Sequence, residues 1–154
     1  ENITTKNYLI QVRPKFVNRD QEVNFNYDNL SIKSDGRDSW KSFIDKDLKP
    51  MDPLNAQIQI RLNLLNNMEE FTIQLVEIKN GAVEENFYKI IGEEICGLGA
   101  KEYECIILKR QRKKESRETL YYLAPELDFM FLKIIDTAPE RTQKLELLEI
   151  LSLG

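Results

Sequence analysis

Three runs of consecutive apolar residues constrain the fold more than any other feature of this chain. They are Cys105–Leu108, Leu120–Leu123 and Phe129–Leu132. Each has the length of a short strand. Because successive side chains of a strand point to opposite faces, these runs make both faces of a sheet apolar. Both faces need cover from a helix, the amino-terminal segment, curvature of the sheet onto itself, a bound apolar ligand or another protein.

The chain from residue 70 onward repeats this strand pattern and predicts an antiparallel meander. The Asn80-Gly81 pair is a strong signal for a tight hairpin, because both residue types tolerate a positive φ. The six expected strands are Glu70–Ile78, Ala82–Ile91, Lys101–Arg112, Arg117–Leu123, Asp128–Thr137 and Thr142–Leu151. Three segments nearer the amino terminus have the same pattern, namely Tyr8–Phe16, Glu22–Tyr27 and Leu30–Lys33.

Between these two groups of strands the sequence favours helix. Asp52-Pro53 is a good helix start, since Asp accepts hydrogen bonds from free backbone amides and Pro fits the first helical position. We therefore expect a helix over Asp52–Asn66, although alternate apolar residues over Ala56–Leu64 would also fit a strand. A shorter helix is expected over Ser39–Asp47. The apolar stripe expected to face the sheet consists of Leu54, Ile58, Leu62 and Leu65.

Length and composition indicate a folded globular protein. The 154 residues predict one domain over residues 1–154, with 42% apolar and 31% charged residues. A formal net charge of -4 argues against a nucleic-acid-binding protein. The chain has no histidine, which excludes serine–histidine and cysteine–histidine catalysis and imidazole metal sites. We expect no enzymatic activity, no cofactor and no metal.

Cys96 and Cys105 are expected to be free thiols. They flank Gly97–Ala100, which predicts a hairpin tip centred on Leu98-Gly99. In that register the two cysteines lie roughly four residues apart along the strands, or about 13 Å, beyond the limit of about 7 Å for a bridge. The alternative is a disulfide of an exported protein.

A longer pattern carries a family resemblance. Its most specific part is the aromatic-x-Ala-Pro-x-Leu stretch Tyr122–Leu127 with the strand that follows, and weaker matches are Asp52-Pro53-Leu54 and Gly92-Glu93-Glu94. These residues resemble the bacterial domain of unknown function 3108 family over roughly residues 7 to 152, with part of the family's amino-terminal strands missing. The chain departs from the family pattern at Tyr122, Phe131 and Cys96-Gly97, where tryptophan, proline and a Thr-Pro pair are usual.

The resemblance implies an exported, periplasmic protein of Gram-negative bacteria. It also implies a fold similar to the lipoprotein-carrier proteins, whose incomplete barrel wraps helices around an acyl-chain cavity. We accordingly expect a mostly β, α+β fold in which a strongly curved antiparallel sheet, an incomplete barrel, packs on one or two helices. The expected function is non-enzymatic binding of a lipid, acyl chain or lipoprotein in the concavity. The alternative is a cell-envelope protein-interaction or assembly factor that uses a sheet edge or an apolar patch.

Two sets of residues are candidates for such a site. The densest basic patch lies between Lys109 and Arg117, and it either contacts anionic head groups or forms a solvated turn that protects a strand edge. The head-group candidates are Lys109, Arg112, Lys113 and Lys114. The apolar-cavity candidates, which core packing would also explain, are Trp40, Phe43, Leu120, Tyr122, Phe129 and Phe131. The expected partners are a lipid, a lipoprotein or an envelope protein, with no nucleic acid and peripheral membrane contact at most.

Overall fold

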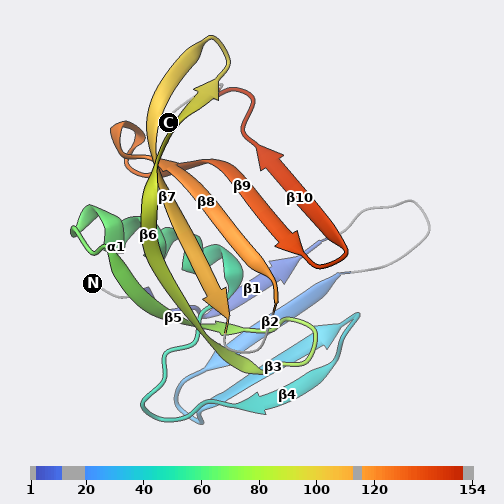
Figure 1. The fold of residues 1–154 in the computed structure, drawn as a ribbon. Helices are drawn as coiled ribbons and strands as arrows, with labels where there is room; N and C mark the ends of the chain where they lie inside the picture. Colours follow the sequence, from blue (N-terminus) through green and yellow to red (C-terminus); the bar gives the residue numbers. More distant parts are fainter. Residues whose placement is uncertain (1–2, 12–19, 113–115, 151–154) are drawn as a thin grey trace. The chain divides into compact units, whose positions relative to one another are not determined.

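The fold consists mostly of antiparallel strands. A computed structural model describes residues 3–11, 20–112 and 116–150. These residues form one α-helix, one short 3-10 helix and ten strands in two antiparallel sheets (Figure 1), which confirms the expected mostly β, α+β class. The elements are β1 (Asn7–Ile10), β2 (Gln21–Asn26), β3 (Ser31–Gly36), β4 (Trp40–Phe43), α1 (Pro53–Leu65), β5 (Glu70–Val76), β6 (Val83–Leu98), β7 (Lys101–Arg112), β8 (Glu118–Ala124), η1 (Pro125–Leu127), β9 (Met130–Ala138) and β10 (Arg141–Glu146).

The chain divides into two compact units, each of which is described by itself. The first comprises Glu1–Gln59 and Ile73–Glu85, and the second comprises Ile60–Thr72 and Asn86–Gly154. The dividing points fall inside α1, β5 and β6, so neither unit is one continuous stretch of chain. The expectation of a single domain over residues 1–154 stays a prediction.

The first unit contains the four-stranded sheet, with the strand order β1-β2-β3-β4. Buried and exposed residues alternate along β2, as they do in a sheet with one covered face. Val23 and Phe25 of β2 pack with Ile32, Ile44 and Val76 in one cluster. The two expected strands at β2 and β3 are confirmed, and β1 confirms the start of the third.

Strand β4 replaces the helix expected over Ser39–Asp47, and that expectation is wrong. Trp40 pairs with Ser34 of β3, and its indole Nε1 donates a hydrogen bond of 2.8 Å to the backbone oxygen of Ile78. Trp40 also packs against the cluster of the first unit. Ladder hydrogen bonds and an anchored indole outweigh a weak helical periodicity of a few apolar residues.

Helix α1 confirms the helix expected over Asp52–Asn66. The Asp52 Oδ1 atom accepts hydrogen bonds from the backbone N–H groups of Leu54 (2.8 Å) and Asn55 (3.0 Å). Asp52 is fully buried, and its Oδ2 atom accepts from the Thr5 hydroxyl at 2.7 Å and the Asn55 side-chain amide at 2.6 Å. Both carboxylate oxygens are therefore partnered, as the burial of a charged group requires.

The buried side of α1 is not the expected one. Leu54, Ile58 and Leu65, three of the four residues in the expected stripe, are 57%, 45% and 48% exposed. The buried apolar side chains of the helix are instead Ala56, Ile60 and Leu64. The expectation fails because the helix carries apolar residues on both sides, so periodicity alone cannot select the buried one.

The six-stranded sheet has the order β10-β9-β8-β7-β6-β5, in which strands that follow one another in sequence are neighbours. The meander expected from residue 70 onward is confirmed. Its strand bounds differ from the expected ones chiefly at two ends, since β6 runs on to Leu98 and β10 ends at Glu146. Figure 1 shows the strands of the second unit, from β6 to β10, side by side.

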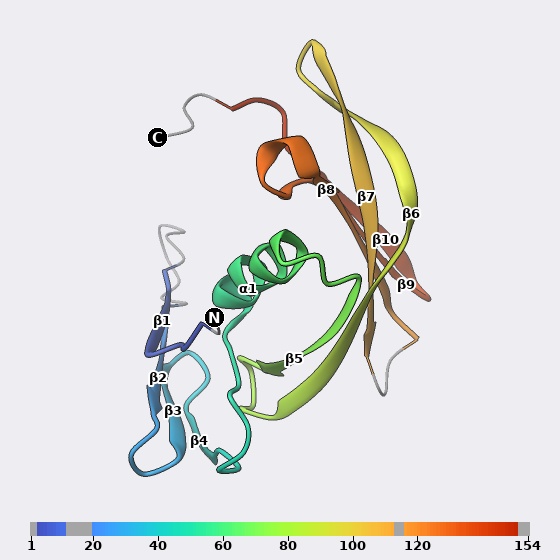
Figure 2. The same cartoon turned by 90° about the vertical axis from the view of Figure 1, so that its left-hand side faces the viewer.

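The face of this sheet that carries Cys96, Cys105 and Tyr122 is called the disulfide face here. These residues belong to one buried cluster, and Leu127 of η1 and Leu147 after β10 pack against it. Figure 2 shows η1 and the segment after β10 on the same side of the sheet. Part of the cover of this face therefore comes from the carboxyl-terminal end of the same unit.

The opposite face, called the tyrosine face, carries a row of aromatic rings. The ring centroids of Tyr88 and Tyr121 are 6.3 Å apart, and those of Tyr121 and Phe131 are 5.5 Å apart. Phe71 stacks on Tyr88 at 5.4 Å. Leu108, which pairs with Tyr121 in the ladder, is fully buried. Both faces are thus apolar at the centre of the sheet, as the consecutive apolar residues predict.

Cys96 and Cys105 form a disulfide, so the expectation of free thiols is wrong. The hairpin turns at Gly99-Ala100, one residue later than expected, with Leu98 paired to Lys101. Moving the turn by one residue shifts every ladder partner by two. The two cysteines therefore lie diagonally across the ladder, with a Cα–Cα distance of 6.0 Å that lies within the usual range for a disulfide.

This pairing predicts that both thiols resist alkylation until the protein is reduced. Intact-mass measurement is expected to show no adduct without reductant and two adducts after denaturation with reductant. Replacing both cysteines by serine is expected to lower the free energy of unfolding by about 2–3 kcal/mol, because the bridge closes a short loop in the unfolded chain. Two adducts on the unreduced, unfolded protein would contradict the bridge.

The loop between β5 and β6 predicts a second effect on stability. Gly81 has a φ of +72°, and the ring of Trp40 occupies the space that a Cβ atom would need. Gly81→Ala is expected to lower the free energy of unfolding by about 1–3 kcal/mol, measured by urea denaturation. Gly97→Ala is the matched control, since no atom lies within 4 Å of its added Cβ, and a change below about 0.5 kcal/mol is expected. Equal effects of the two substitutions would refute this account of Gly81.

Candidate functional site

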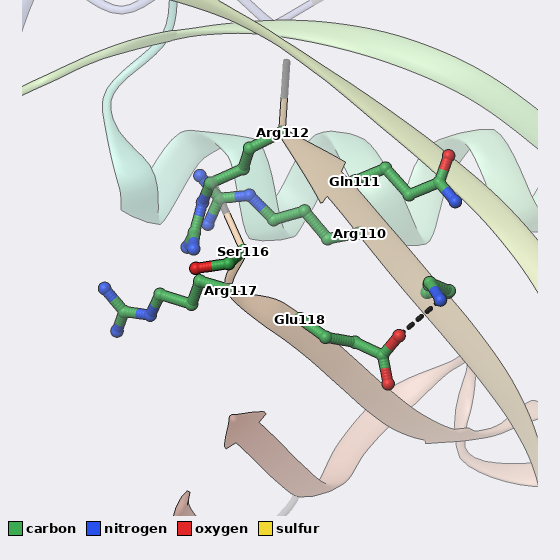
Figure 3. A pocket seen from close by; sticks show the side chains of 7 residues that line it. Arg110, Gln111, Arg112, Ser116, Arg117 and Glu118 are labelled. Carbon is green, nitrogen blue, oxygen red and sulfur yellow. Dashed lines mark ion pairs between the residues drawn. The ribbon is translucent and has the colours of Figure 1, made fainter. Parts of the chain in front are cut away.

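A pocket of about 350 Å³ lies in the second unit where β7 ends and β8 begins. It is lined by Lys109, Arg110, Gln111, Arg112, Ser116, Arg117 and Glu118. The apolar run of β7 ends at Leu108, and the strand continues for four polar residues that carry three basic side chains. Figure 3 shows the side chains of Arg110, Arg112 and Ser116 close together, Arg117 starting beside Ser116 with its guanidinium extending away, and Glu118 apart from them.

Side chains along β7 point alternately to the two faces of the sheet, so the lining residues of this strand are divided between the faces. Arg110 pairs with Tyr88 and Thr119 in the two neighbouring ladders, so it lies on the tyrosine face, as does Arg112 two residues later. Lys109 pairs with Leu120 and lies on the disulfide face, where it forms an ion pair with Glu118. The arginines of β7 are thus separated from the lysine that precedes them.

Arg110 is held by a buried amide. Its Nε atom donates a hydrogen bond of 2.8 Å to the Oδ1 atom of Asn86, a residue with no exposed surface. A guanidinium has five N–H groups, so this bond fixes the plane of the group while leaving its terminal nitrogens available as donors. Burial raises the pKa of the neighbouring Tyr88, whose hydroxyl therefore stays neutral beside the arginines.

Arg117 is held by a carboxylate on the next strand. Its Nε atom lies 2.9 and 2.8 Å from the two carboxylate oxygens of Asp136, and its Nη2 atom also pairs with Oδ2. Thr119, which stands opposite Asp136 in the β8–β9 ladder, donates its hydroxyl to Oδ1 at 2.8 Å. The hydrogen bond from Arg117 holds the pKa of Asp136 below its usual value, against the opposing effect of burial.

Basic groups dominate this pocket. The basic side chains at the site are Lys109, Arg110, Arg112 and Arg117, and its acidic side chains are Glu118 and Asp136. The formal charge of this set is positive. Forked guanidinium groups donate hydrogen bonds to carboxylates and phosphates, so the chemistry that this arrangement favours is anion binding. Within the described residues, no group of three or more Cys, Asp or Glu side chains is placed to hold a metal ion.

Two of the four head-group candidates line the pocket, namely Lys109 and Arg112. The other two, Lys113 and Lys114, lie outside the described residues. The head-group set did not include Arg110, Arg117 or Ser116, which also line the pocket. The period of two along β7 could have found Arg110, since it places this residue on the same face as Arg112.

The apolar-cavity candidates are divided between the two units and, within the second unit, between the two faces of the sheet. Trp40 and Phe43 belong to the first unit, where Trp40 packs against its core and Phe43 is 71% exposed beside Lys41.

Within the second unit, Leu120 and Tyr122 lie on the disulfide face, whereas Phe131 contacts Tyr121 on the tyrosine face. Phe129 is half-buried and has a φ of +56° in the turn after η1. Because Tyr122 and Phe131 are on opposite faces of one sheet, they do not line a common cavity.

The Arg117–Asp136 pair predicts a pH-dependent contribution to stability. The pKa of Asp136 is lower in the folded protein than in the unfolded chain, so the unfolded chain binds more protons as the pH falls toward its usual pKa. The stabilisation is therefore complete above the unfolded pKa and is lost as the pH falls through the folded one. Asp136→Asn is expected to lower the free energy of unfolding by about 1 kcal/mol at pH 7, and this difference from the unchanged protein should shrink below about pH 4.

Urea denaturation at pH 7, 5 and 3 measures this dependence. Glu140→Gln is the control, since it removes an exposed carboxylate from the turn between β9 and β10 of the same unit. A difference for Asp136→Asn that is the same at all three pH values would show that the charge of Asp136 does not contribute.

Comparisons with known proteins assign no family to this chain. No family model, curated protein or solved structure matches it. In the part of the chain that the structure describes, no helix has the length and apolar character needed to cross a membrane. The resemblance to the domain of unknown function 3108 family stays a prediction.

Proposed function

We propose that this protein is a non-enzymatic binding module for a lipid, an acyl chain or a lipoprotein, acting in the periplasm of a Gram-negative bacterium. The basic pocket at the β7–β8 end would hold an anionic head group, and apolar surface of the sheet would contact the hydrocarbon. The single observation that carries the proposal is the convergence of arginines on a pocket that adjoins an apolar sheet. The strongly curved, incomplete-barrel arrangement is part of this proposal.

The disulfide face supports contact with an apolar ligand next to the pocket. Leu120 stands directly opposite Lys109 in the ladder, and Ile107 lies two residues before Lys109 on the same face. Leu120, Ile107 and Ile135 pack against the buried cluster of this face but are themselves only half-buried. Each Å² of hydrocarbon moved from water onto such a surface contributes about 25 cal/mol. This apolar surface therefore lies beside Lys109, whereas Arg110 and Arg112 reach the pocket from the tyrosine face.

The disulfide supports the proposed location. Disulfides form and persist in oxidising compartments such as the bacterial periplasm and are rare in the cytosol. The bridge between Cys96 and Cys105 is buried in the cluster of the disulfide face, where it ties β6 to β7. An exported protein is therefore favoured.

A protein-interaction or assembly factor of the cell envelope is the second candidate function. Strand β10 is an edge of the six-stranded sheet, and all six of its residues are exposed. An exposed edge can pair with an extended segment of another protein through main-chain hydrogen bonds. The charged side chains of this strand, among them Lys144 and Glu146, weaken this candidate because charges at an edge oppose such pairing.

Native mass spectrometry of the purified protein tests the first proposal, and co-purified lipid or fatty acid is the expected result. A fluorescent fatty acid is expected to bind, and Lys109→Gln with Arg112→Gln is expected to weaken this binding about tenfold or more at low salt. Arg141→Gln with Lys144→Gln removes two exposed basic groups from β10 and is the matched control.

The outcomes separate the two candidate functions. A clean mass of the unliganded protein, no binding of the fatty acid, and a stable dimer or a captured envelope protein would favour the interaction factor. Equal loss of fatty-acid binding in both double variants would show that general charge, and not the pocket, attracts the ligand.

A further inference from the structure

We infer that the basic pocket recognises a terminal phosphoryl group, as in a phosphate monoester, in preference to a carboxylate. This inference rests on the proposed function, because it specifies the anion that the same pocket binds. The phosphoryl group belongs either to a lipid head group or to a soluble phosphate. The chemistry of recognition is the same for both sources, and the experiment below distinguishes them.

The donors of the pocket come from two directions. Arg110 and Arg112 extend from one face of β7, whereas Ser116 and Arg117 come from the chain that leads into β8. Figure 3 shows Arg110, Arg112 and Ser116 close together, with Arg117 starting beside Ser116. A carboxylate presents two oxygens in one plane, which a single guanidinium fork satisfies. A terminal phosphoryl group presents three oxygens in tetrahedral directions. Donors from two strands and a hydroxyl suit the phosphoryl group better.

The pocket also has an excess of positive charge. Among the described residues that line it, together with Asp136, four side chains are basic and two are acidic, an excess of two positive charges. A phosphate monoester carries about -1.5 to -2 at neutral pH, whereas a carboxylate carries a single negative charge. The charge of the monoester therefore matches the excess at the site more closely.

Two of the arginines are held in place before a ligand arrives. The fully buried Asn86 anchors the Nε atom of Arg110, and Asp136 together with Thr119 anchors Arg117. Asn86 and Asp136 are positioning residues in this account. Anchored donors lose less conformational freedom on binding than long side chains on an open surface do, so the site gains affinity without further contacts.

Arg110→Lys is the decisive substitution. Lysine keeps the positive charge at this position but has no Nε–H to donate to Asn86 and no planar fork. A site that attracts anions only through its charge would not change. A built phosphoryl site is expected to bind inorganic phosphate about tenfold more weakly after this substitution. Arg141→Lys makes the same chemical change at an exposed position on β10 and is the control.

Isothermal titration of the unchanged protein with inorganic phosphate and with acetate, at one ionic strength, tests the preference without any variant. Phosphate is expected to bind at least tenfold more tightly than acetate. Flotation with phosphatidylcholine vesicles, with and without phosphatidic acid, tests the lipid source. Circular dichroism of both lysine variants checks that they are folded, and the comparison of phosphate with acetate stands even if Arg110→Lys does not fold.

Binding of phosphatidic acid vesicles without binding of free phosphate identifies a lipid head group, provided that Arg110→Lys weakens it. Binding of free phosphate without binding of vesicles supports the phosphoryl site and counts against the lipid function. Equal measurable affinity for phosphate and acetate, no binding of either phosphate or phosphatidic acid vesicles, or an unchanged affinity in Arg110→Lys overturns the inference. If the fluorescent fatty acid still binds in that case, the proposed function survives, so the failure of the two proposals can be told apart.

Discussion

The six-stranded sheet is apolar on both faces, and the structure of the second unit depends on how these two faces are covered. Tyr121, Tyr122, Leu123 and Ala124 of β8 are all buried, which places apolar side chains on both faces at successive positions. Neither face can be left to water, because each exposed ring or aliphatic chain would forfeit its transfer free energy. The disulfide face is covered in part by η1 and the segment after β10, and the tyrosine face carries its own row of aromatic rings in contact.

The basic pocket lies where the apolar residues of β7 and β8 end. Strands β7 and β8 continue past their apolar residues, and there the same alternation that buries Leu108 on the tyrosine face brings Arg110 and Arg112 to that face. Charged groups next to a core need partners, since an unpaired buried charge is costly. Asn86 and Asp136 provide such partners for two arginines and also hold them in defined positions. The groups that make the strand ends stable are therefore those that shape the pocket.

Sequence patterns predicted most of the strands and the main helix, because period and turn residues report on local structure. They failed where a choice depended on distant contacts. The expected stripe of α1 and its buried side are both apolar, so only tertiary packing selects between them. Trp40 lies in a strand because it pairs with β3 in the ladder and its indole donates a hydrogen bond to the carbonyl of Ile78. A helix would not provide these two interactions. The disulfide was not predicted because the turn lies one residue later than expected, which shifts each ladder partner by two residues.

The same reasoning explains why the candidate site could be foreseen only in part. A run of basic residues marks the position of a site along the chain, but a strand divides such a run between two faces. Lys109 forms an ion pair with Glu118 and lies opposite Leu120 in the ladder. Arg110 lies on the other face and donates a hydrogen bond to Asn86, on a strand more than twenty residues earlier. The apolar candidates were chosen by residue type alone, and Tyr122 and Phe131 ended on opposite faces because a bulge between β8 and β9 shifts the register between Tyr122 and Leu123. Ladder register, and not composition, therefore decides which side chains act together in this protein.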